Sequence, residues 1–144
     1  MKTTKRYVLT NERDPSEKLR RIKRCVDGEL GGFIESEENL PQSENGWVSG
    51  NAQVSGDARV SGNARVSGHA QVSGGEWESS PIQIEFCKHF VTNSAPGKIT
   101  IGCQTHSFSD WLKYYKLIGK RSGYSPTEIQ QYGSIIRLIV KIGV

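Results

Sequence analysis

The sequence predicts a mainly β protein with some α-helix, and three observations support this fold class. A valine recurs every six residues from Val48 to Val72, and a glycine follows two positions after each one. Segments on both sides of this repeat alternate apolar and polar residues, which is typical of strands. The last third of the chain carries two runs with the apolar spacing of amphipathic helices. We therefore predict a basic β-strand entry over residues 1–33, a repeat body over residues 34–75, and a β-hairpin plus two helices over residues 76–144.

Each repeat unit is predicted to be a short strand followed by a turn. A period of six does not keep valine on one face of a helix with 3.6 residues per turn, and glycine in every unit disfavours a helix further. The valines and the small residue four positions later should point inward. The glycines permit the turn, and the residue after each glycine should tolerate left-handed dihedral angles or bond its own backbone. The inward residues are then Val48, Val54, Val60, Val66, Val72, Ala52, Ala58, Ala64 and Ala70, and the turn residues are Asn51, Asp57, Asn63 and His69.

An aliphatic residue followed four positions later by a small one, at period six, resembles the hexapeptide-repeat left-handed parallel β-helix proteins. This resemblance implies three units per triangular coil, so that positions 18 apart stack, with Val48 over Val66 and Val54 over Val72. It also implies that Ile34 and Leu40 form the first rungs. Members of the family associate side by side, so the resemblance implies a homo-oligomer, either a trimer or a dimer.

Two stretches outside the repeat resemble the small phage and prophage members of this family. Residues 28–40, which lead to Trp47 and Val48, look like the N-terminal entry of those proteins. Residues 101–106, followed by Phe108 and Trp111, resemble the segment after their repeat. The resemblance implies a phage or prophage origin and carries over no common activity.

The flanks are predicted to cap the ends of the repeat body. Residues 7–9 and 19–25 are expected to form strands before it. After it, residues 82–86 and 98–102 are predicted to pair as a β-hairpin around a turn at residues 93–97. A helix should begin at Ser107 or Ser109 and run to about Gly119, with an apolar stripe of Trp111, Leu112, Tyr115, Leu117 and Ile118. A second should begin at Ser125-Pro126 and run through Val140.

Composition places further bounds on the protein. The chain has 144 residues and a mean hydropathy of −0.53, and no apolar run reaches the roughly 20 residues that span a membrane. There is no apolar stretch of a signal peptide behind the basic N-terminus. Three cysteines, an odd number, favour free thiols and a cytoplasmic location over a disulfide framework.

Charge is segregated along the chain: residues 1–24 carry a net charge of +6, residues 25–45 carry −6 and residues 98–144 carry +5.

Candidates for catalysis and metal binding are weak. Many β-helix proteins are CoA-dependent acyltransferases with a catalytic histidine, but His69 is explained by its turn position. Cys87, His89, Cys103 and His106 include zinc-type ligands, although C-x-H with C-x-x-H is not a standard structural-zinc spacing. Cys103 with His106 as a nucleophile pair would need an orienting group that the sequence does not indicate. We assign no catalytic residue, no metal and no cofactor.

Nucleic-acid binding is an alternative function. Basic and aromatic residues are interleaved near the C-terminus, as phosphate and base contacts require, and the N-terminal segment is also basic. Against this alternative, the acidic segment lies close by and no known nucleic-acid-binding module is present. The interleaved residues are Lys113, Tyr114, Tyr115, Lys116, Lys120, Arg121 and Tyr124.

We expect a non-enzymatic recognition protein that binds a host protein, and that could inhibit host defence. A rigid scaffold with charged ends and no credible active site favours this function over acyl transfer. The predicted partner-binding residues are Arg59 and Arg65, which face outward from the repeat, and Trp47 and Trp111, which we expect to be exposed.

Overall fold

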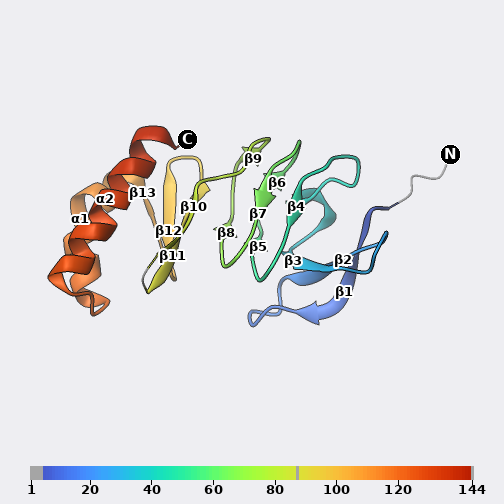
Figure 1. Cartoon of the computed structure of the whole chain (residues 1–144), viewed down its shortest axis with the longest axis horizontal. Helices are drawn as coiled ribbons and strands as arrows, with labels where there is room; N and C mark the ends of the chain where they lie inside the picture. The colour runs from blue at the N-terminus through green and yellow to red at the C-terminus, as the bar shows by residue number, and fades with distance from the viewer. Residues whose placement is uncertain (1–4, 87, 144) are drawn as a thin grey trace. The chain divides into compact units, whose positions relative to one another are not determined.

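The computed structural model describes residues 5–86 and 88–143 and shows a mainly β protein with two helices, as predicted (Figure 1). The chain divides into two compact units, Met1–Pro81 and Ile82–Val144. In the described residues, the first unit contains strands and a single 3₁₀ turn, whereas the second contains four strands and both helices. Within the described part of the chain, neither helix is long and apolar enough to cross a membrane.

The first unit begins with three antiparallel strands, β1 (Tyr7–Arg13), β2 (Arg20–Arg24) and β3 (Leu30–Ile34). The predicted strands near residues 7–9 and 19–25 are therefore confirmed. The following short strands have two residues each: β4 (Trp47–Val48), β5 (Gln53–Val54), β6 (Arg59–Val60), β7 (Arg65–Val66), β8 (Gln71–Val72) and β9 (Glu76–Trp77). From β3 onward the pairing within this unit is parallel: β5 and β8 extend the first three strands into a mixed sheet of order β1-β2-β3-β5-β8, while β4 with β7 and β6 with β9 form two-stranded sheets.

These short strands pair in parallel with strands three units away. Val48 lies opposite Val66 and Val54 lies opposite Val72, which is the stacking of positions 18 apart that the family resemblance implies. In the next pair Trp77 takes the place of a valine opposite Val60. Every repeat valine and every repeat alanine is at most 2% exposed, so the predicted inward residues form the core of this unit.

Two details of the repeat differ from the prediction. The left-handed dihedral angles belong to the glycines themselves, with φ of +61° at Gly50 and +58° at Gly56, and to none of the residues that follow them. Glycine has no Cβ, so it takes this conformation at the least steric cost. Leu40 is fully buried but follows a 3₁₀ turn, Glu37–Asn39, and is not part of a strand.

Carboxylates of residues 25–45, the acidic segment, form hydrogen bonds and ion pairs within the first unit. The carboxylate of Glu35 accepts a hydrogen bond from the backbone N–H of Gly56 at 3.1 Å, and that of Glu44 accepts one from the N–H of Gly62. Asp27 pairs with Arg24 at 2.8 Å, and this hydrogen bond lowers the pKa of Asp27 to about 2. These carboxylates satisfy local donors, so the segment is not a uniformly acidic free surface.

The second unit is an antiparallel sheet of order β10-β11-β12-β13 followed by two helices (Figure 1). Its strands are β10 (Gln83–Phe86), β11 (His89–Ala95), β12 (Lys98–Ile101) and β13 (Gln104–Ser107). The predicted hairpin of residues 82–86 with 98–102 is wrong, because β11 lies between the two and pairs with both. The polar residues Thr92, Asn93 and Ser94 of β11 are about 1% exposed, so the first part of the turn predicted at residues 93–97 is instead a buried strand.

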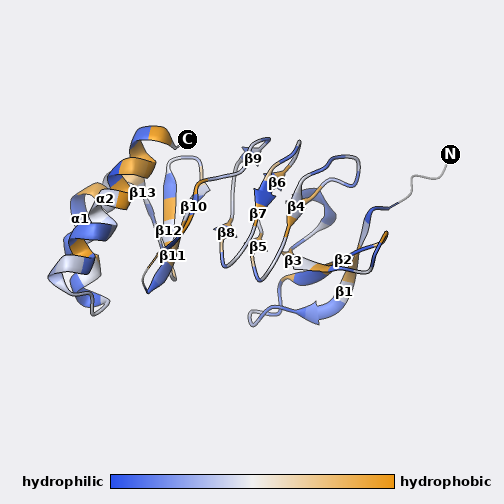
Figure 2. Ribbon diagram, in the orientation of Figure 1, coloured by the Kyte–Doolittle hydropathy of each residue, from blue (hydrophilic) through white to orange (hydrophobic). Residues whose placement is uncertain are grey.

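The helices are α1 (Phe108–Arg121) and α2 (Pro126–Ile142), and both predicted N-caps are confirmed. Ser107 accepts from the N–H of Asp110 at 3.1 Å, and Ser125 accepts from the N–H of Glu128 at the same distance. Figure 2 shows hydrophobic and hydrophilic residues alternating along both helices. The predicted stripe on α1 is only partly right: Trp111 is buried, but Leu112 and Leu117 are 41% and 45% exposed. The core of this unit consists of Val91, Ile99, Ile101, Trp111, Tyr132, Ile136 and Ile139.

Candidate functional site

Neither tryptophan predicted as an exposed contact residue is exposed. Trp47 is 6% exposed, packs edge-on against Tyr7 with ring centroids 6.3 Å apart, and lies beneath the guanidinium of Arg24. Trp111 is 3% exposed, and its indole Nε1 donates to the carbonyl oxygen of Ile99 at 2.7 Å. Aromatic rings bury much area, and an indole N–H with a backbone partner suits a core position. Both side chains therefore have structural roles, and the expectation that they are exposed is wrong.

The two predicted arginines do lie on the surface of the repeat. Arg59 on β6 and Arg65 on β7 are exposed, each next to a buried valine. Arg59 lies 3.9 Å from the carboxylate of Glu76, its neighbour in the parallel register. An exposed pair at this distance contributes little to stability. The two side chains thus remain candidates for contact with a partner.

Among the described residues the histidines and cysteines do not all gather into one site, although His89 and Cys103 both line a small cavity. His69 is exposed at a turn, and His106 bonds Gln104 at 3.0 Å while its ring meets the edge of Trp111. Cys25 and Cys103 are exposed free thiols, and Cys87 lies outside the described residues. In the described ranges, 5–86 and 88–143, no three His, Cys, Asp or Glu residues are placed to hold a metal ion.

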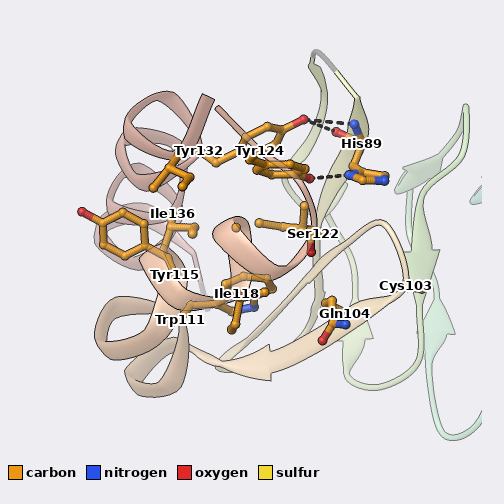
Figure 3. Close-up of a pocket in the computed structure, with 13 residues that line it drawn as sticks. His89, Cys103, Gln104, Trp111, Tyr115, Ile118, Ser122, Tyr124, Tyr132 and Ile136 are labelled. Carbon is orange, nitrogen blue, oxygen red and sulfur yellow. Dashed lines mark hydrogen bonds between the residues drawn. The ribbon is translucent and has the colours of Figure 1, made fainter. Parts of the chain in front are cut away.

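A histidine–tyrosine cluster lies where β11 meets the helices (Figure 3). The hydroxyl of Tyr124 bonds Nδ1 of His89, and the two rings stack with centroids 5.5 Å apart. The hydroxyl of Tyr132 donates to the carbonyl oxygen of Phe86 at 2.6 Å and accepts from the N–H of His89 at 3.0 Å. Tyr124 also stacks on Tyr132, with ring centroids 4.8 Å apart. These contacts tie the loop between the helices to the sheet.

Beneath this cluster is a small cavity of about 50 Å³. Its walls are largely the apolar side chains of the second unit's core. Figure 3 shows Trp111, Ile118 and Ile136 among the residues that line it. Polar groups are confined to a few positions such as Gln104 and Ser122. The volume suits a few water molecules, not a substrate with its reacting partner.

A larger groove runs between α1 and α2. Its volume is about 780 Å³, which is in the range of small-molecule ligand pockets. Three cations, Lys116, Lys120 and Arg137, are exposed along it, and no carboxylate is among the described residues that line it. Those residues are Tyr115, Lys116, Lys120, Tyr124, Pro126, Ile129, Gln130 and Arg137.

Close packing of the two helices fixes the floor of this groove. A Cβ on Gly133 would lie 2.5 Å from the ring of Tyr115, and one on Gly119 would lie 2.8 Å from Ile129. Glycine at these positions therefore lets the side chain of one helix rest on the backbone of the other. Figure 3 shows the hydroxyl of Tyr115 directed away from the cavity, and it accepts a hydrogen bond from Arg137 at 3.3 Å.

Glu128 and Asp110, the carboxylates of the two helices, do not line the groove. Glu128 accepts from the backbone N–H of Ser125 at 2.8 Å and lies 3.4 Å from the ammonium of Lys88. The hydrogen bond from Ser125 and the nearby charge of Lys88 lower the pKa of Glu128. Asp110 lies in the first turn of α1, away from the groove lining. With eight basic and three acidic residues, the second unit carries a net charge of +5.

The same helices carry most of the exposed apolar side chains. Of the large hydrophobic residues more than about two-fifths exposed, five lie on α1 and α2: Leu112, Tyr114, Leu117, Leu138 and Ile142. Single exposed apolar residues are normal on a surface, so it is their concentration on these two helices that makes the helices a candidate contact surface. We call the whole exposed surface of α1 and α2, which includes Leu117, Leu138 and the groove, the hairpin face.

Part of this site is visible in the sequence. The interleaving of charge and aromatic rings marks Lys116, Lys120, Tyr115 and Tyr124 as candidate contact residues. Arg137 was missed, because it is a single cation in an apolar helix and only the packing of α2 on α1 brings it beside the lysines.

No model of a known protein family matches the sequence, and neither the curated proteins nor the solved structures include a match.

Proposed function

We propose that this chain is a non-enzymatic recognition protein that binds a host protein through the hairpin face. The observation that carries the proposal is the composition of that face, where Leu117 and Leu138 are 45% and 48% exposed on helices that also carry the exposed cations Lys116, Lys120 and Arg137. Burying such apolar side chains against a partner gains roughly 25 cal/mol per Å² of apolar area, and the cations orient the encounter. The resemblance to phage and prophage proteins supports a host protein as the partner, with inhibition of host defence as the consequence.

We further propose that the repeat forms a short left-handed parallel β-helix that serves as a rigid base. Parallel pairing of Val48 with Val66 and of Val54 with Val72 supports this proposal. The outward Arg59 and Arg65 would lie on its sides, where a trimer or dimer of this chain would form its contacts. The exposed free thiols of Cys25 and Cys103 are compatible with a reducing compartment such as the cytoplasm.

The test is capture from a nuclease-treated bacterial lysate by the tagged protein, read by quantitative mass spectrometry. A Leu117→Asp/Leu138→Asp variant places charge on the hairpin face. A Val26→Asp variant is the matched control, because Val26 is 87% exposed in the first unit. We expect one stoichiometric protein with the native chain and with the control, and its loss with the double variant.

Two results would contradict the proposal. Equal capture by the double variant would remove the hairpin face from the interaction. Loss of all captured material on nuclease treatment would favour the alternative, a nucleic-acid-binding accessory protein. Charge reversal at Arg59 and Arg65, followed by light scattering, tests the proposed sides of the oligomer separately.

A further inference from the structure

We infer that the groove between α1 and α2 binds an acidic peptide segment of the partner, with carboxylates on Lys116, Lys120 and Arg137 and an apolar side chain on Ile129 and Pro126. This inference rests on the proposed function and names the chemistry of the partner. It is argued from the charge of the groove, from the state of its aromatic rings and from the fixed position of Arg137.

The charge of the groove selects an anionic occupant. Its three cations are exposed, and in the part of the chain that the structure describes no carboxylate lines the groove to neutralise them. Lys116 and Lys120 are four residues apart on α1 and so lie on one side of that helix. Arg137 reaches the groove from α2. An occupant must therefore present negative charge toward both helices, which a segment with several carboxylates does.

Arg137 is already held in position to bind a carboxylate. Its Nη1 donates to the hydroxyl of Tyr115 and its Nη2 to Oγ of Ser134, both at 3.3 Å. A guanidinium carries five N–H donors in a rigid fork, so donors directed away from these two contacts can bind a carboxylate. Because the side chain is oriented before binding, less conformational entropy is lost when the partner arrives.

The aromatic rings argue for a peptide over a single-stranded nucleic acid. Nucleic acids bind such grooves by stacking bases on exposed ring faces. The ring of Tyr124 stacks on His89 and Tyr132, with the ammonium of Lys88 5.7 Å from its centroid. The ring of Tyr115 lies against Gly133 and beside the guanidinium of Arg137, 5.9 Å from its centroid. Both rings are engaged within the unit, so they form a floor and not a stacking platform.

The test uses a fluorescein-labelled peptide of repeated Glu-Glu-Leu, with fluorescence anisotropy of the full chain as the readout. The comparison probes are the same peptide with Gln in place of Glu, and an oligothymidylate of equal length. The groove variant is Lys116→Gln/Lys120→Gln/Arg137→Gln. The control, Lys98→Gln/Arg121→Gln/Lys141→Gln, removes the same charge from the same unit outside the groove lining. Circular dichroism establishes that each variant is folded.

We expect the acidic peptide to bind and the Gln peptide to bind at least about tenfold more weakly. The affinity of the groove variant for the acidic peptide should fall about tenfold, while that of the control variant should stay within about twofold of the native chain. Absence of peptide binding, equal losses in both variants, or tighter binding of the oligothymidylate with loss in the groove variant would each overturn the inference. If the groove variant still captures the lysate partner, the proposed function stands and only the groove inference fails. Peptide binding without any captured partner would instead contradict the proposed function.

Discussion

The side-chain amide of Asn39 donates to the carbonyl oxygen of Ala58 at 2.8 Å and to that of Gly56 at 3.1 Å. The oxygen of the same amide accepts from the backbone N–H groups of Glu35 and Ser36 at 3.1 and 2.9 Å. Asn39 is 1% exposed, so water does not replace these partners readily. One side chain thus connects the acidic entry segment to a repeat unit nearly 20 residues later.

Replacing Asn39 with alanine should therefore lower the free energy of unfolding of the first unit by about 2–4 kcal/mol. Each buried backbone group that loses its partner costs about 1–3 kcal/mol, and relaxation recovers part of that cost. Urea unfolding followed by tryptophan fluorescence measures the effect. In a Trp111→Phe background only Trp47 and Trp77 emit, and both lie in the first unit. Asn45→Ala is the matched control, because Asn45 is exposed in the same segment. Equal shifts in the two variants would show that the amide contacts are not stabilising.

Gly56→Ala should destabilise the repeat far more than Gly28→Ala. Both glycines have positive φ, +58° and +74°, so both substitutions carry a left-handed strain of about 1–2 kcal/mol. A Cβ at Gly56 would also lie 2.8 Å from the carbonyl oxygen of Ser73, whereas one at Gly28 meets only Lys23 at 3.6 Å. We expect a loss of about 3 kcal/mol for Gly56→Ala and about 1 kcal/mol for Gly28→Ala. The midpoints of urea unfolding compare them, and equal midpoints would refute the close approach at Ser73.

The repeat was predictable because its residues obey one rule at each position. Valine is β-branched and apolar, alanine fits where space is small, and glycine permits positive φ. The period and the residue types therefore predict the same short strands and turns. Trp77 departs from that rule. It lies opposite Val60 in the parallel pair, but the six-residue spacing of valine and glycine does not extend to Trp77, so the repeat does not predict this strand. The parallel partner of a strand is visible in sequence only where the repeat is regular.

Strand β11 was not predictable by the same reasoning. Asn, Ser, Pro and Gly in sequence normally indicate a turn, and only the last two of residues 93–97 form it. Asn93 stays in the sheet because its side-chain amide donates to the carbonyl oxygens of Ala95 and Lys98, both at 3.0 Å. The candidate groove depends similarly on tertiary packing, since Gly119 and Gly133 bring Arg137 beside the lysines of α1.

Trp111→Phe should reduce stability without changing partner capture. The substitution removes the hydrogen bond from Nε1 to Ile99 and part of a ring that is 3% exposed, at a cost of about 2 kcal/mol. Because the ring lies in the core, the hairpin face keeps its composition. Thermal unfolding of the second unit tests the expected loss of stability, and lysate capture with the same preparation tests whether partner binding is unchanged. Loss of capture in a variant that remains folded would restore Trp111 as a contact residue.

Acidification should weaken the turn between β1 and β2 through Asp14. Burial opposes ionisation of this carboxyl, but hydrogen bonds from Ser16 and from the N–H of Leu19 outweigh it and lower its pKa. The carboxylate accepts from Oγ of Ser16 at 2.6 Å and from the N–H of Leu19 at 2.9 Å. A lowered folded-state pKa means that the unfolded chain binds the proton more readily.

The contribution of Asp14 is therefore complete above the unfolded-state pKa of about 3.9 and is lost as pH falls through the lower folded-state pKa. Asp14→Asn keeps an acceptor but no charge, so its unfolding free energy should change less than that of the native chain over this acidic range. Urea unfolding at a series of pH values gives the comparison. Parallel pH profiles for the two proteins would show that Asp14 does not contribute, because a titrating group with a lowered pKa must produce a difference in slope.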